Sequence, residues 1–190
     1  MLHRLIAGSI LLGSIGLFAV TANAQVKDTT SSAKKFGYVG VEKCGMCHKT
    51  EKQGKQLSIW QGSKHAEAYK TLQTEKADKI AKEKGFTTKA VETKECLGCH
   101  ATGYDADASL KGPKFKVEDG VQCETCHGAG SEYMKVMKNK EEAMAKGLIV
   151  PKDKEKFCTG CHNSKSPTFT GFDVDKYWAK ISHMIPKDTK

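Results

Sequence analysis

Four copies of one short pattern, Cys-x-x-Cys-His, constrain this chain more than any other feature. Chance would place about 0.01 such pentads in a chain of 190 residues with eight cysteines and seven histidines. The four copies together use every cysteine. They are Cys44-Gly45-Met46-Cys47-His48, Cys96-Leu97-Gly98-Cys99-His100, Cys123-Glu124-Thr125-Cys126-His127 and Cys158-Thr159-Gly160-Cys161-His162.

The residue types of the pentad match the chemistry of covalent haem attachment. Two thiols at this spacing can form thioethers with the two vinyl groups of one haem, and the adjacent imidazole can reach the iron. Disulfides, which suit an exported chain with an even cysteine count, and zinc knuckles, which also contain Cys-x-x-Cys, are the alternatives. Neither explains a histidine directly after every second cysteine. The sequence therefore predicts four covalent heme c groups, with His48, His100, His127 and His162 as iron ligands.

The N-terminal residues have the pattern of a cleavable signal peptide. Arg4 precedes an apolar run from Leu5 to Val20, and Ala22-Asn23-Ala24 offers the small-x-small site that signal peptidase accepts. An uncleaved anchor is the alternative, but this run spans only about 24 Å of a hydrocarbon core of roughly 30 Å. We therefore predict export to the periplasm, with the extracellular space as a further destination. The predicted division is a signal peptide over 1–24, a disordered tether over 25–35 and a single tetrahaem domain over 36–190.

Too few large apolar side chains follow the signal peptide for an ordinary core. From Gln25 onward 25 of 166 residues are Leu, Ile, Val or Phe, about 15%, and a charged chain with less than roughly 20% of these residues is normally disordered. Each haem is a flat apolar group larger than any aromatic side chain, so we expect the haems to form the core and the chain to be unfolded without them. The residues expected to line the gaps between haems are Phe36, Tyr38, Ile59, Trp60, Leu97, Tyr104, Val121, Tyr133, Phe157, Phe172 and Trp178.

Local patterns favour a mainly α fold, with short helices and irregular loops wrapped around the four haems and at most a small β-hairpin. The pentads are spaced too unevenly for a stacked repeat. Lys114–Val117 alternates polar and apolar residues and is the candidate strand, and Asp153 can cap a turn that leads into the fourth pentad. The predicted helices cover Val41–Gln53, Ile59–Gln73, Lys76–Lys84, Ser131–Lys138, Glu141–Lys146 and Asp173–Ser182.

Histidines are too few to give every iron two imidazole ligands. Four haems need eight axial ligands, the pentads supply four, and only His65 and His183 remain after the signal peptide. Each follows a tryptophan by five residues, and we predict both as distal ligands. The other two irons must take a thioether, a lysine, a terminal amine or water, or stay open. The thioether candidates, whose ordinary role is core filling, are Met134, Met137, Met144 and Met184.

The chain resembles the cytochrome c-554/c-prime family, tetrahaem carriers best known from ammonia oxidisers. The likeness covers roughly Phe36 to Ile185 and rests on the four pentads and on the stretch Trp60-x-x-Ser63-x-His65-Ala66-x-Ala68-Tyr69. The resemblance implies periplasmic electron transfer, closely packed haems and His65 as a distal ligand. In the family's type member it also implies one five-coordinate haem linked to nitric oxide reduction. Three bis-histidine haems and a fourth haem with its pentad histidine would need seven histidines, one more than follow the signal peptide in this chain.

The charge pattern bears on the partners. After the signal peptide every cation is a lysine, and the absence of arginine argues against a nucleic-acid reader. Basic stretches at 76–89 and 135–156 also carry many acidic residues, so a solvated face is the plain alternative to a docking surface. We expect periplasmic redox proteins, acidic ones in particular, as electron donor and acceptor, and no stable membrane insertion. The oligomeric state stays open.

The sequence favours an electron-transfer protein over an enzyme. The leading prediction is a periplasmic multiheme cytochrome that passes electrons through closely packed haems. The first alternative is a small oxidoreductase that reduces nitric oxide, or converts another small nitrogen species, at an open haem. Only Glu124, Glu118 and Tyr133 are candidates for acid–base work, near the third pentad, and surface or packing roles are the alternative for each. The second alternative is a subunit of an extracellular haem filament.

Overall fold

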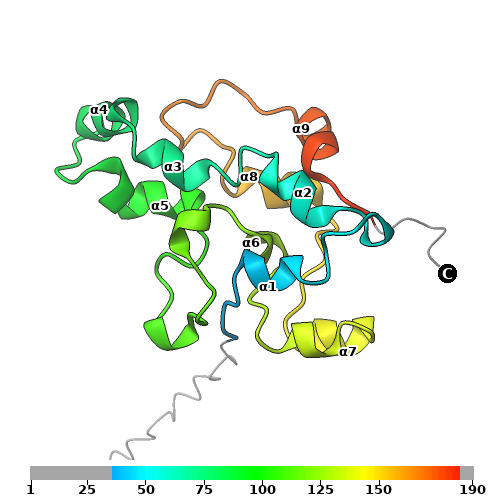
Figure 1. The fold of residues 1–190 in the computed structure, drawn as a ribbon. Coiled ribbons are helices and arrows are strands. Elements are labelled where there is room, and N and C mark those ends of the chain that lie inside the picture. The colour runs from blue at the N-terminus through cyan, green and yellow to red at the C-terminus, as the bar shows by residue number, and fades with distance from the viewer. Residues whose placement is uncertain (1–35, 185–190) are drawn as a thin grey trace, which may run out of the picture. The chain divides into compact units, whose positions relative to one another are not determined.

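The computed structural model describes residues 36–184. The predicted signal peptide and tether lie outside these residues. The described chain is helical, with short helices joined by long irregular segments (Figure 1). Its elements are α1 (Val41–Gly45), η1 (Glu51–Gln53), α2 (Gln56–Gln61), α3 (Ala68–Leu72), α4 (Glu75–Glu83), η2 (Ala90–Glu92), α5 (Lys94–His100), η3 (Ala108–Leu110), η4 (Val117–Asp119), α6 (Cys123–His127), η5 (Tyr133–Val136), α7 (Lys140–Ala145), α8 (Lys154–Thr159) and α9 (Val174–Ile181), where η denotes a 3₁₀ turn.

Side-chain caps define where several helices begin. Thr74 accepts a hydrogen bond from the backbone N–H of Ala77 at the start of α4, and Asp173 accepts one from Lys176 at the start of α9. Asp153 caps α8 in the same way, through the N–H of Lys156, as the sequence predicts. The helices α4, α7 and α9 lie within one or two residues of their predicted bounds. These are the segments in which a local cap and a local stop signal agree.

Other helix predictions were too long, two helices were missed, and the helix α8 was predicted only as a turn. The predicted helix over 59–73 is interrupted between Gln61 and Ala68, and the one over 41–53 stops at Gly45 before a 3₁₀ turn. The predicted helix over 131–138 is only the 3₁₀ turn η5. The missed helices are α5 and α6, which contain the second and third pentads. Periodicity cannot mark them, because their faces are made of cofactor-binding residues.

The strand predicted at Lys114–Val117 is absent, and residues 36–184 contain only an isolated parallel bridge between Tyr38 and Lys111. The Phe115 N–H closes a turn onto the Gly112 carbonyl, and the Lys116 carbonyl accepts from the side chain of Gln122 at 2.6 Å. These backbone groups are therefore paired locally and do not form a ladder. The described residues are mainly α and contain no hairpin, which agrees with the prediction of at most a small one.

Few apolar side chains are buried in the described chain. Five of its eight buried apolar residues are alanines, and the others are Val41, Leu72 and Tyr133. One small cluster joins Leu72 of α3, Ala81 of α4 and Ala90 of η2, with Phe86 and Leu97 packed against it. This composition agrees with the expectation that side chains alone do not make the core.

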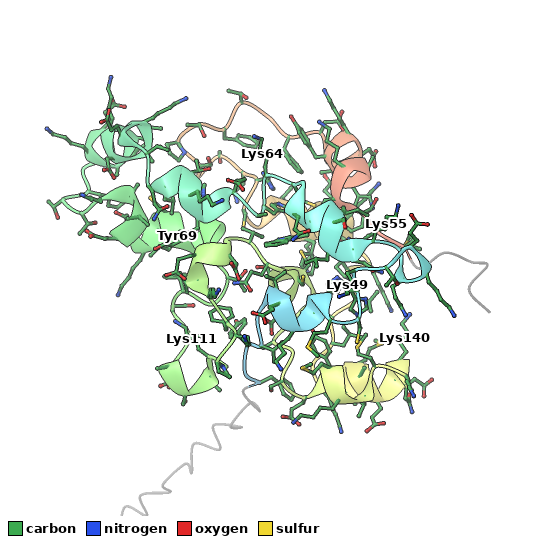
Figure 2. The ribbon with its side chains drawn as sticks, viewed as in Figure 1. Lys49, Lys55, Lys64, Tyr69, Lys111 and Lys140 are labelled. Atoms are coloured by element: carbon green, nitrogen blue, oxygen red, sulfur yellow. The ribbon has the colours of Figure 1, made fainter. Side chains whose placement is uncertain are left out.

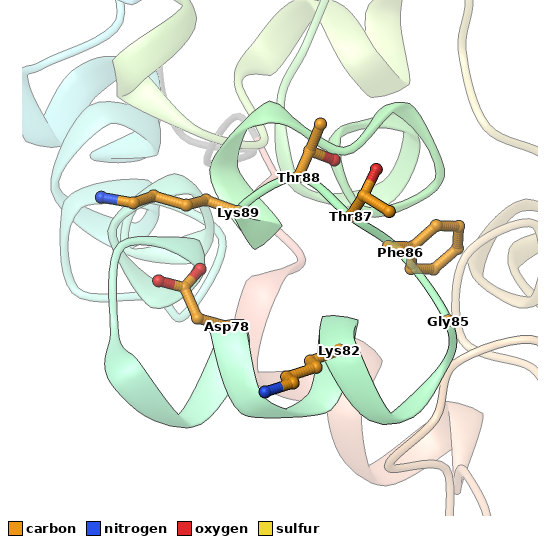
Figure 3. A pocket seen from close by; sticks show the side chains of 7 residues that line it. All are labelled: Asp78, Lys82, Gly85, Phe86, Thr87, Thr88 and Lys89. Carbon is orange, nitrogen blue, oxygen red and sulfur yellow. The ribbon is translucent and has the colours of Figure 1, made fainter.

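Two hollows mark the described surface. The first, about 490 Å³, lies between α4 and the loop that follows it, and no pentad residue lines it (Figure 3). The second, about 410 Å³, has Tyr38 and Tyr104 in its wall and is lined by residues of three pentads, among them Cys99, Glu124 and Cys161. Only the second hollow is therefore placed to hold part of a cofactor bound to the pentads.

Candidate haem-binding site

Each pentad lies in a short helix or in the turn that ends one. The second and third pentads lie within α5 and α6, whereas the first and fourth begin in the last turns of α1 and α8 and run on into turns. The His48 and His162 N–H groups each donate to the carbonyl of the first cysteine of their own pentad. Because residues three and four apart lie on the same side of a helical turn, each pentad presents both thiols and its imidazole together.

The thiols of different pentads come together in the folded chain. The Cys123 thiol of the third pentad lies close enough to Cys44 of the first to raise the pKa of Cys44, and burial, together with Cys99 of the second, raises the pKa of Cys161 in the fourth. Burial raises the pKa of Cys126 of the third pentad, and Cys158 of the fourth lies close enough to raise it further. In Figure 1, α1 and α6 lie together near the centre, and these two helices are in contact. The four pentads thus form one connected group.

All eight cysteines are free thiols. Burial, with the nearby Cys158 as a second cause, raises the pKa of Cys126 to about 11, and burial and the neighbouring Cys99 raise the pKa of Cys161 to about 12. Zinc binds cysteine as the thiolate, which these environments disfavour. No three His, Cys, Asp or Glu side chains within residues 36–184 converge into a metal-holding cluster. The arrangement suits neutral sulfur, as in a thioether, better than a zinc knuckle.

Both predicted distal histidines face a pentad histidine. The ring centroids of His65 and His162 are 6.2 Å apart, and those of His127 and His183 are 5.9 Å apart. Two imidazoles on opposite sides of one metal, with metal–nitrogen bonds of about 2.0 Å and ring radii of about 1.1 Å, have centroids about 6 Å apart. The fourth and third pentads therefore each have an imidazole partner at the separation that one iron requires.

Backbone carbonyls orient several of these imidazoles. Nδ1 of His100 lies 2.8 Å from the Ala68 carbonyl, Nδ1 of His127 lies 3.0 Å from that of Ile149, and Nδ1 of His183 lies 2.9 Å from that of Ile181. Because a carbonyl oxygen only accepts, each Nδ1 must carry the proton, which leaves Nε2 free to bind a metal. Burial also lowers the pKa of His65 and His127, favouring the neutral form that coordinates iron.

An aromatic stack flanks the fourth pentad's histidine. Phe172 stacks on His162 with centroids 4.1 Å apart and planes within 10°, and Tyr177 stacks on Phe172 at 5.0 Å. The sequence singled out Phe172 as a residue lining a gap between haems, whereas the structure places it against a predicted iron ligand. No local signal indicates this contact, because Phe172 and Tyr177 reach His162 from a different segment of the chain.

Known proteins support the haem assignment. The family model described as cytochrome c554 and c-prime matches residues 43–128, which contain the first three pentads and His65. A protein named cytochrome c-554 from Nitrosomonas europaea is 29% identical over 183 residues, covering 82% of this chain and 74% of that protein. Residues 43–128 of this chain are therefore similar to the cytochrome c554 and c-prime family. No solved structure matches the chain.

The family match and this relative support a c-type cytochrome, an electron carrier whose haem is covalently attached through cysteine. The residues of this chain fit that group, because each pentad presents two free thiols beside an imidazole and two of these imidazoles have facing partners. No helix within residues 36–184 is both long and apolar enough to cross a bilayer. The family match ends at residue 128, so the fourth pentad rests on its own Cys158-Cys161-His162 pattern.

The first and second pentads have no such histidine partner. No histidine ring within residues 36–184 faces His48 or His100 in the way that His65 faces His162. The thioether candidates Met134, Met137 and Met144 are 40–43% exposed, and Met184 is 81% exposed. The candidates for the sixth ligand at these two pentads are therefore those that the sequence predicts: a thioether, a lysine, a terminal amine, water or no ligand.

Proposed function

We propose that this protein is a periplasmic tetrahaem electron carrier of the cytochrome c554 and c-prime family, with two bis-histidine haems. The observation that supports it most is the pair of imidazole separations, His65 to His162 and His127 to His183, both near the distance that one iron requires. When bound, heme c supplies reversible one-electron chemistry. The chain contributes the ligands, their orientation and the exclusion of water, which set each reduction potential.

The contacts between pentads support an order for the electron path. The first pentad lies next to the third, because α1 contacts α6, and the second lies next to the fourth, because Cys99 and Cys161 line the same hollow. The third and fourth approach each other at Cys126 and Cys158. We propose that electrons pass in the order first, third, fourth, second, with the two bis-histidine haems in the middle and the two haems without a histidine partner at the ends.

We further propose that the partners are acidic periplasmic redox proteins. Lysine is the cation throughout the described chain, and Figure 2 labels lysines on segments from the end of α1 to the start of α7. Most lysines that pair with an acid do so at exposed positions, as in the pairs Lys70–Glu67 and Lys135–Glu132. Exposed pairs are weak and are screened by salt, so these lysines can exchange an internal partner for an external one.

One observation favours the alternative activity, the conversion of nitric oxide or another small nitrogen species. His48 and His100 face no second histidine within residues 36–184, so a haem on either pentad can keep one side of its iron for an added ligand. The same experiment tests both functions, because an open haem is high-spin when oxidised and a bis-histidine haem is low-spin.

The test is made on the exported, haem-loaded protein. Its intact mass should exceed that of the chain beginning at Gln25 by four haems, and the oxidised protein should show two low-spin bis-histidine signals in EPR and magnetic circular dichroism. Nitric oxide should change only the signals of the other two haems. A mass corresponding to fewer haems, or fewer than two bis-histidine signals, would contradict the carrier as proposed. Four low-spin haems inert to nitric oxide would end the enzyme alternative.

A further inference from the structure

His65 lies in the turn that separates α2 from α3. The segment before the third pentad, residues 120–122, holds this turn in place. The His65 carbonyl accepts the Val121 N–H at 3.0 Å. The indole N–H of Trp60 donates to the Val121 carbonyl at 2.8 Å. The two polar groups of one residue, Val121, are thus bound to the two ends of the Trp60–His65 segment.

The segment that holds His65 is itself fixed on its other side. The Gly120 carbonyl accepts from the N–H of Thr102 at 2.9 Å and from its hydroxyl at 3.1 Å, and the Thr102 hydroxyl accepts the Gln122 N–H at 2.7 Å. Thr102 and Gln122 are 6% and 2% exposed. These buried hydrogen bonds make 120–122 a firm support for the His65 turn.

Gly120 allows the two backbones to approach closely. Its φ of 73° and ψ of −135° lie in a region that only glycine adopts readily. A Cβ at this position would come within 2.7 Å of the His65 carbonyl oxygen. The support therefore depends on a missing side chain at Gly120 as well as on the indole of Trp60.

We propose that Trp60 is a positioning residue for the iron ligand His65, acting through the Val121 peptide, with Gly120 allowing the contact. The inference rests on the proposed role of His65 opposite His162. Trp60 touches neither imidazole in a hydrogen bond; it holds the backbone from which His65 projects. A ligand held in this way leaves its iron less often, because the turn cannot swing away without breaking the indole bond.

The second tryptophan supplies a matched control. Trp178 precedes His183 by the same five residues, but its indole has no hydrogen-bond partner within residues 36–184. His183 is oriented instead by the carbonyl of Ile181, within its own segment. The shared spacing predicts the same Trp–His arrangement at both sites. Within residues 36–184, however, only the indole of Trp60 makes a hydrogen bond, to the Val121 carbonyl.

The experiment compares four variants of the haem-loaded protein: Trp60→Phe, Gly120→Ala, Trp178→Phe and His65→Ala. Carbon monoxide binding to the reduced protein is followed by stopped flow, because it replaces His65 only when that ligand has left the iron. We expect the slow phase that disappears in His65→Ala to become about fivefold faster in Trp60→Phe, the factor expected for one lost hydrogen bond. Gly120→Ala should accelerate it further, and Trp178→Phe should leave it unchanged.

Each other outcome is informative. If His65→Ala creates no high-spin haem in EPR and removes no slow phase, the ligand assignment in the proposed function is wrong. If His65→Ala does both but Trp60→Phe matches the parent protein, His65 is a ligand and the positioning role of Trp60 is wrong. Equal acceleration in Trp60→Phe and Trp178→Phe would also overturn it, as would a lower denaturation midpoint of Trp60→Phe with unchanged carbon monoxide kinetics. Added imidazole should restore the low-spin signal in His65→Ala.

Discussion

At the scale of single residues, Glu124 differs most from its sequence-based interpretation. The carboxylate is 3% exposed and accepts hydrogen bonds from the N–H groups of Val39, Gly40 and Gly130, at 2.7–3.1 Å. Burial raises its pKa, and these three donors oppose the rise. Both oxygens are occupied by the backbone, so Glu124 ties the segment before α1 to the loop after α6 and is poorly placed for acid–base chemistry.

Replacing this carboxylate should destabilise the haem-loaded protein. Glu124→Ala leaves three buried or half-buried N–H groups without an acceptor, and each costs about 1 kcal/mol or more, so we expect a loss of about 3 kcal/mol. Guanidinium unfolding followed by circular dichroism measures it. The control is Glu118→Ala, at an exposed position near the same pentad, which should change stability by less than about 0.5 kcal/mol. Similar losses in both variants would contradict this role.

At the scale of elements, α3, α4, η2 and α5 are the part of the described chain that side chains hold together. Leu72, 4% exposed, packs with Ala81 and Ala90, and the cluster extends to Leu97 of the second pentad. Asp78 of α4 also accepts the Ala90 N–H at 2.8 Å. This group resembles an ordinary small core, whereas the other helices owe their places mainly to loops and pentads.

Truncation of Leu72 tests that difference. Leu72→Ala should cost about 2–5 kcal/mol, because it removes the largest side chain of the cluster and leaves a cavity. Ile149→Ala removes a similar side chain that is 44% exposed, and it should cost less than about 1 kcal/mol. Denaturant midpoints of the two haem-loaded variants give the comparison. A Leu72 variant as stable as the Ile149 variant would show that the cluster contributes little.

At the scale of the whole molecule, the described chain buries too few apolar side chains to fold by them alone. Five of the eight that it buries are alanines, and alanine burial contributes little free energy. The pentads lie close together, because α1 and α6, which carry cysteines of the first and third, are in contact, and Cys99 of the second and Cys161 of the fourth line the same hollow. Covalent haems joined there would supply the missing apolar surface.

The chain without haems should therefore be unfolded. Replacing all eight cysteines with serine blocks attachment while leaving the remaining residues unchanged, and we expect a far-ultraviolet circular dichroism spectrum of a disordered chain with no cooperative melt. The haem-loaded parent protein is the control and should be helical and melt cooperatively. A helical serine variant with a sharp melting transition would show that the side chains suffice.

The haem chemistry of this protein can be predicted from its sequence, because the groups that attach a haem are close neighbours in the chain. Cys44 to His48 and the three similar pentads carry two thiols and an imidazole within five residues, and one helical turn brings them together whatever the rest of the chain does. The caps Thr74, Asp153 and Asp173 are local in the same sense. The mainly α class and the shortage of apolar residues follow from composition and periodicity.

The groups that meet across the chain could be identified only in the folded structure. His65 faces His162, His183 faces His127, and Trp60 reaches Val121, each between segments far apart in sequence. Local pattern cannot predict these pairs, because they depend on how the loops close. The equal spacing of Trp60–His65 and Trp178–His183 shows the limit most clearly: the two segments share one pattern, but within residues 36–184 only the indole of Trp60 donates a hydrogen bond to a distant carbonyl.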